Sequence, residues 1–187
     1  MTVIRDRYLQ AEKMRITIKL SIILIFGISI PTEIYACTCS IKKLADWQKS
    51  ELENSECIFI GEVIKVNNDL TYEIKVTESL DGGDAKGNIY IGQNWKYCSP
   101  YVENKGKWII YGRMENGFLK MNMCGISRPF ENPMVNPIPP PPELYENKIS
   151  ESERNRKVEK LKKENFEIAI KDLKLEINAL RKRRDQE

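Results

Sequence analysis

The sequence predicts a mainly β protein: a small closed barrel of about five antiparallel strands with a short leading helix, plus a charged C-terminal α-helix. Two observations support this fold class. Short β-rich runs separated by turn residues occupy the middle of the 187-residue chain, and a proline-rich stretch then leads into a highly charged run without glycine or proline. Closure of the strands into a barrel is expected because it leaves no strand edge exposed.

Residues 1–36 are expected to be a signal peptide, with Met14 as an alternative start. Arg15 and Lys19 precede the uncharged run of residues 20–30, and Ala36 is the small residue before a cleavage site. This run is too short for a membrane span, which needs about 20 apolar residues. The mature protein is therefore expected to begin at Cys37 and to be secreted.

Charge and composition exclude several classes of function. From residue 37 onward the chain has 25 basic and 24 acidic residues, so no global charge favours nucleic acid as a partner. The chain has no histidine, which excludes histidine-based catalytic triads and removes the commonest metal ligand. No nucleophile and base are recognisable, so neither an enzyme nor a cofactor is predicted.

The first elements are expected in chain order as follows. Residues 43–52 have helical spacing, with Leu44, Trp47 and Leu52 on one face. Turn residues then separate the strand candidates, among them Asp81-Gly82-Gly83 and Asn116-Gly117. The five strands are predicted at residues 58–66, 70–79, 88–91, 107–113 and 118–122.

Five cysteines follow the expected cleavage site. In an oxidising compartment they are disulfide candidates, and they lack the CxxC spacing of structural zinc sites. An odd number leaves one thiol over. Cys57 is the natural candidate, because it lies in the β-rich apolar run 57–66 and is expected to be buried and unreactive. The cysteines are Cys37, Cys39, Cys57, Cys98 and Cys124.

The C-terminal third is of a different kind. Residues 133–149 form a proline-rich linker, and residues 150–187 a charged helical tail, with the helix itself expected over residues 151–185. Two faces carry apolar residues: a seam with coiled-coil spacing (Phe166, Ile170, Leu173, Ile177 and Leu180) and a second row (Leu161, Ile168 and Leu175). The tail is interpreted either as a self-association helix acting through residues 158–180 or as a solvated helix resting on the barrel.

Several stretches between residue 37 and about residue 130 match one family in order and spacing. They are Cys37-Thr38-Cys39, Phe59-Ile60-Gly61-Glu62-Val63, Tyr97-Cys98-Ser99-Pro100-Tyr101, Trp108-Ile109-Ile110-Tyr111-Gly112, and Gly117-Phe118-Leu119 leading to Cys124. With them, residues 37–132 resemble the inhibitory N-terminal domain of the tissue inhibitors of metalloproteinases. That domain is a netrin-like module, so the resemblance implies an OB-like, netrin-type five-stranded barrel.

The resemblance also implies a function. In the family, the α-amino group and carbonyl oxygen of the first cysteine chelate the catalytic zinc of a metalloendopeptidase, a role that falls here to Cys37. Thr38 would enter the S1′ pocket, Cys39 and Ser40 would continue along the cleft, and Lys96, Tyr97 and Ser99 would flank the tethering Cys98. The implied disulfides are Cys37–Cys98 and Cys39–Cys124.

Departures from the family keep an alternative open. The third disulfide of this domain has no counterpart, the proline-containing stretch after the N-terminal cysteines is replaced by Ser40-Ile41-Lys42-Lys43, and the second, cysteine-rich domain is missing. The alternative is a non-inhibitory binding or adhesion module. Because residues 34–37 are close to a lipobox, this module could also be a periplasmic or lipid-anchored protein, with the membrane as a partner only if Cys37 is lipidated.

Overall fold

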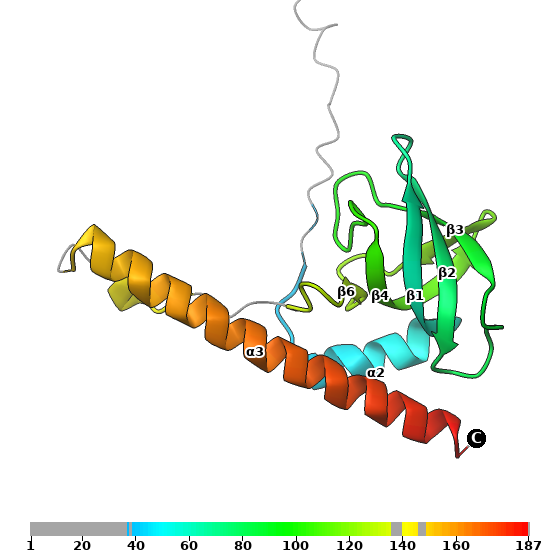
Figure 1. Ribbon diagram of the computed structural model, residues 1–187. Helices are drawn as coiled ribbons and strands as arrows, with labels where there is room; N and C mark the ends of the chain where they lie inside the picture. Colours follow the sequence, from blue (N-terminus) through cyan, green and yellow to red (C-terminus); the bar gives the residue numbers. More distant parts are fainter. Residues whose placement is uncertain (1–36, 38, 136–139, 146–148, 187) are drawn as a thin grey trace, which may run out of the picture. The chain divides into compact units, whose positions relative to one another are not determined.

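The computed structural model describes residues 37, 39–135, 140–145 and 149–186. The predicted signal peptide, Met14 and Thr38 lie outside the described residues. In chain order, the elements are α2 (Leu44–Asn54), β1 (Cys57–Val66), β2 (Thr71–Ser79), β3 (Ile89–Gln93), β4 (Gly106–Glu115), β5 (Phe118–Met121), β6 (Arg128–Pro129), the 3-10 turn η1 (Pro142–Leu144) and α3 (Glu151–Arg184) (Figure 1). The barrel and its two helices, of 11 and 34 residues, agree in outline with the predicted fold class.

Five strands close into a barrel in the order β1-β2-β3-β5-β4, and β4 pairs again with β1. The prediction of a wholly antiparallel barrel is wrong at one pair, because β3 runs parallel to β5 with Gly92 opposite Leu119. The physical reason is geometric: an odd number of strands cannot alternate in direction around a closed ring. The other four neighbouring pairs are antiparallel.

The turn between β4 and β5 shows how local sequence forms the barrel. Asn116 and Gly117 have φ angles of 53° and 82°, the left-handed values of a two-residue type I′ turn. Asparagine and glycine adopt these values at low cost, whereas a β-branched residue does not. The turn fixes the register in which Glu115 lies opposite Phe118.

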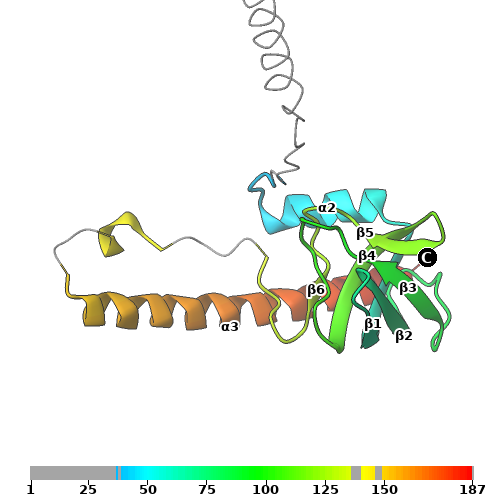
Figure 2. The same cartoon turned by 90° about the horizontal axis from the view of Figure 1, so that it is seen from above.

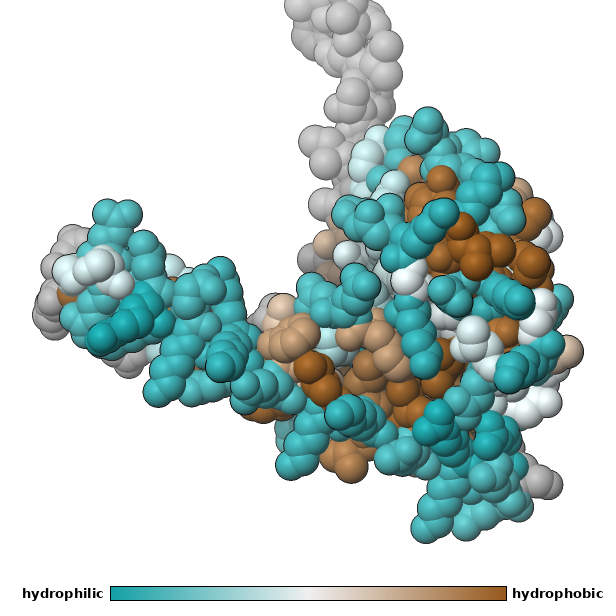
Figure 3. All heavy atoms as spheres, in the orientation of Figure 1, coloured by the Kyte–Doolittle hydropathy of each residue, from teal (hydrophilic) through white to brown (hydrophobic). Residues whose placement is uncertain are grey.

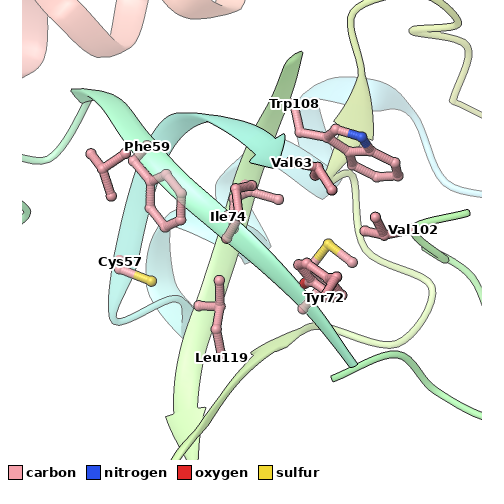
Figure 4. Packing of buried hydrophobic residues seen from close by; sticks show 11 residues of the cluster. Cys57, Phe59, Val63, Tyr72, Ile74, Val102, Trp108 and Leu119 are labelled. Carbon is pink, nitrogen blue, oxygen red and sulfur yellow. The ribbon is translucent and has the colours of Figure 1, made fainter. Parts of the chain in front are cut away.

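The first half of strand β1, residues 57–61, is buried on both faces. Cys57, Phe59 and Val63 point into the barrel, whose interior cluster also includes Tyr72, Ile74, Val102, Trp108 and Leu119 (Figure 4). The alternate residues Ile58 and Ile60 belong to a second cluster on the outer surface of the barrel. This second cluster is completed by the helices: Leu173, Ile177 and Leu180 of α3 are buried there, and Leu44, Trp47 and Leu52 of α2 pack against them.

The C-terminal half of α3 thus rests on the barrel through residues of the predicted seam (Figure 2). Leu144 of η1 is also buried, and η1 contacts α3. On the second row, Ile168 and Leu175 are 54% and 58% exposed. The surface of the first half of α3 seen in Figure 3 is almost wholly hydrophilic. Self-association through residues 158–180 remains a prediction. The exposed second row would be the apolar contact surface for it.

A buried ion pair joins α3 to the barrel. Glu176 of α3 and Arg128 of β6 are 5% and 3% exposed, and Arg128 Nη2 donates to Glu176 Oε2 at 2.8 Å. The same carboxylate accepts hydrogen bonds from the Tyr111 hydroxyl and from Gln48 Nε2, both at 2.7 Å. One side chain therefore links α3 to β6, β4 and α2.

The C-terminal end of α3 has a second, more exposed attachment. Arg181 donates to Glu78 of β2 through Nε at 2.7 Å and through Nη2 at 2.6 Å. These contacts hold the pKa of the Glu78 carboxyl below its usual value. Arg184 Nη1 also donates to the carbonyl oxygen of Ser79 at 2.7 Å. None of the helices in the described ranges combines the length and apolar character required to cross a bilayer.

Candidate functional site

Two disulfides tether the expected mature N-terminus to the barrel. They join Cys37 to Cys98 and Cys39 to Cys124, with Cα atoms 5.7 and 5.5 Å apart, separations in the usual range for a disulfide. Both expected pairings are confirmed. Structural disulfides form in oxidising compartments, so the bridges indicate a protein that folds outside the cytoplasm.

The topology of the barrel brings the two anchoring cysteines together. Cys98 follows β3 and Cys124 follows β5, and because these strands are parallel, both lead to the same end of the barrel. The two segments are also joined directly, since the Cys124 backbone N–H donates to the Ser99 carbonyl at 2.8 Å and Trp95 Nε1 donates to the Met121 carbonyl at 2.8 Å. The parallel pair that the sequence did not predict is thus the feature that assembles the site.

Most of the predicted site residues gather at this end. Cys39, Ser40, Lys96, Tyr97 and Ser99 are exposed, whereas the disulfide-bonded Cys37 and Cys98 are partly buried. The Lys96 ammonium lies 5.1 Å from the centre of the Tyr97 ring, and its interaction with the Tyr97 side chain raises the pKa of Lys96. Thr38 lies outside the described residues.

A buried carboxylate supports the Cys124 loop. Glu51 of α2 is 3% exposed and accepts from Asn122 Nδ2 at 2.6 Å and from the Ser55 hydroxyl at 3.2 Å. Burial raises the pKa of Glu51, and the hydrogen bond from Asn122 opposes this effect. A Cβ on Gly125 would lie only 2.4 Å from Glu51 Oε1, so glycine permits this close approach. Glu51 and Asn122 thereby fix the loop that bears Cys124.

Glu51 was not identified from the sequence as a buried residue, although its position in the helix indicates this burial. It lies four residues after Trp47 and seven after Leu44, which places it on the apolar face of the helix. A carboxylate at such a position needs a polar partner. Asn122 is that partner, but the distance along the chain hides it.

A groove lies beside the Cys39–Cys124 disulfide. Its volume is about 540 Å³, and the residues lining it come from the segment after Cys98, from the start of β4 and from the region around β6. They include Ser99, Tyr101, Lys105, Trp108, Arg128 and Glu131. The groove adjoins the tethered N-terminus, so a partner bound there could also reach the groove.

Cys57 is a buried free thiol, as predicted. Burial raises its pKa to about 12, with smaller contributions from Asp84, Asp81 and Glu56. We expect the folded protein to resist alkylation by iodoacetamide at about pH 8, because only a thiolate reacts. Mass spectrometry should show one added carbamidomethyl group only after denaturation without reduction, and rapid labelling of the native protein would contradict this assignment.

The part of the chain that the structure describes contains no group of three or more cysteine, aspartate or glutamate side chains placed to hold a metal ion. What this end of the barrel presents is two disulfide-tethered residues, Cys37 and Cys39, with exposed flanking side chains. Comparison with family models found no match, and comparison with curated proteins found none either.

Proposed function

We propose that this protein is a secreted inhibitor of zinc metalloendopeptidases that acts through the backbone of Cys37. The observation that carries the proposal is the pair of disulfides, which fix residues 37 and 39 against two neighbouring loops at one end of the barrel. A terminus held in this way loses little conformational freedom on binding, which favours tight association. The netrin-type barrel is part of the same proposal.

The chemistry requires a free α-amino group on Cys37. Such a group has a pKa of about 7.7 to 8.0, so its neutral form is accessible near neutral pH, and coordination to zinc favours that form further. With the Cys37 carbonyl oxygen, it would take coordination positions that a catalytic zinc leaves open for water or substrate. Inhibition follows because the water that attacks the substrate is displaced.

The disulfide also bears on the lipid-anchored alternative. A thiol engaged in the Cys37–Cys98 bridge cannot carry a lipid, so this bridge favours a free, unlipidated terminus. The same thiol cannot serve both roles in one molecule. Mass spectrometry of the mature N-terminal peptide distinguishes the two forms.

The test is an N-terminal extension by one residue. We expect the mature protein to inhibit at least one enzyme in a panel of zinc endopeptidases, and an additional alanine before Cys37 to raise the inhibition constant at least about 100-fold, equivalent to ~2.7 kcal/mol. The extension converts the amine into an amide, which is a poor zinc ligand, and leaves both disulfides in place. A matched control adds the alanine after Glu187 instead and should inhibit like the mature protein. The chelation mechanism would be refuted if the N-terminally extended form inhibited as well as the C-terminally extended control. It would also be refuted if none of the three proteins, the mature protein included, inhibited any enzyme of the panel.

A further inference from the structure

Exposed apolar side chains are concentrated around the two disulfides. Ile41, Tyr97, Tyr101 and Met123 are 89%, 65%, 37% and 45% exposed, and each lies within three residues of a bridged cysteine. They are four of the ten large apolar side chains that are exposed among the described residues. Large apolar and aromatic side chains at the surface are typical of the centre of a protein interface.

Lysines accompany these apolar side chains. The segments that the bridges join, residues 39–43, 95–103 and 120–125, contain four lysines and one acidic residue, Glu103. Lys42, Lys43 and Lys96 are exposed, and no ion pair in the described ranges includes them. Outside these segments, the chain from residue 37 onward has slightly more acidic than basic residues. The excess of positive charge is therefore confined to this end of the barrel.

Aromatic rings hold some of these ammonium groups at the surface. Lys42 Nζ lies 4.8 Å from the centre of the Trp47 ring, and Lys96 Nζ lies 5.1 Å from that of Tyr97. Such contacts orient a cation without neutralising it. The positive charges therefore remain available to a partner.

We infer, on the basis of the proposed inhibition, that the partner is a zinc endopeptidase whose cleft is lined by apolar side chains and rimmed by carboxylates. The apolar side chains would pack against the cleft walls beside the tethered N-terminus. Lys42, Lys43 and Lys96 would face the acidic rim, so charge complementarity would select among proteases and speed their encounter. Proteases with neutral or basic rims would be inhibited more slowly.

The experiment compares two charge reversals of equal size. One variant carries Lys42→Glu, Lys43→Glu and Lys96→Glu. The control carries Lys75→Glu, Lys86→Glu and Lys174→Glu, three exposed lysines outside the three segments and outside the ion pairs of the described residues. Circular dichroism first verifies that both variants fold.

We expect the association rate constant with a protease that the wild type inhibits to fall at least about tenfold in the first variant at low ionic strength. The control should stay within about threefold of the wild type. At about 1 M salt, where the Debye length is about 3 Å, the first variant should come within about threefold of the wild type.

Three outcomes would count against the acidic rim. Equal rates for the two variants, or a tenfold loss that persists in high salt, would overturn this inference while the proposed inhibition stands. Absence of inhibition by the wild type across the panel would overturn the proposed function and this inference with it. The two kinds of failure are therefore distinguishable.

Discussion

Replacement of Glu176 by alanine is expected to lower the free energy of unfolding by about 3 to 5 kcal/mol, because removal of one partner leaves a charge buried and unpaired. The stranded group would be the guanidinium of Arg128, whose side chain is 4% exposed. The Tyr111 hydroxyl and Gln48 would lose their acceptor as well. Urea unfolding, followed by tryptophan fluorescence and circular dichroism, measures the loss.

A matched control is available on the same helix. Glu164 forms an ion pair with Lys160 at 3.8 Å, and both side chains are more than half exposed. Glu164→Ala should cost less than about 1 kcal/mol, as exposed pairs generally do. The double variant Arg128→Met with Glu176→Leu should recover most of the lost stability, since it leaves no unpaired charge. Equal effects of Glu176→Ala and Glu164→Ala would show that the buried pair does not hold the helix.

Removal of the Cys39–Cys124 bridge is expected to have a comparable effect. The cysteines are 85 residues apart in sequence, but the Cys37–Cys98 bridge shortens the path between them to about 28 residues, and restriction of the unfolded chain over such a loop corresponds to about 3.6 kcal/mol in the chain-entropy description. We expect the variant Cys39→Ser with Cys124→Ser to lose about 2 to 5 kcal/mol in urea unfolding under oxidising conditions.

Reduction provides the internal control for this variant. With a strong reductant, the wild type and the variant both lack all bridges, so their unfolding midpoints should nearly coincide. The difference should therefore appear only in the oxidised proteins. A midpoint that is the same for both oxidised proteins would mean that this bridge does not stabilise the fold.

Much of the fold could be predicted because its signals are local. The predicted boundaries of the two helices and five strands all lie within two residues of the observed ones. The turn at Asn116 and Gly117 and the burial of Cys57 follow from residue type and the pattern of neighbouring residues. The pairing of the cysteines came instead from a family resemblance.

The features that were not predicted depend on contacts between distant segments. The sequence does not reveal that β3 and β5 are parallel, because that pairing depends on how residues 94–105 cross the end of the barrel. Nor does it reveal the burial of Glu176 or Arg128, since each looks like an ordinary surface residue until its partner, 48 positions away, is known. Three residues of the predicted coiled-coil seam, Leu173, Ile177 and Leu180, pack against the barrel of the same chain.

Burial of the first half of β1 on both faces has a consequence for how the chain avoids mispairing. A strand with one solvent-exposed face cannot shift its register by one residue without exposing its apolar side chains to water. In Cys57–Ile60 both faces are apolar and buried, so the alternation of polar and apolar residues does not prevent such a shift. Here the fit of Gly61 opposes it, because a Cβ at that position would lie 2.7 Å from the Ile74 side chain. A shifted strand would place Ile60 or Glu62 at this crowded point, so side-chain size opposes the shift in this part of the strand, and burial of the Glu62 carboxylate would add to the cost.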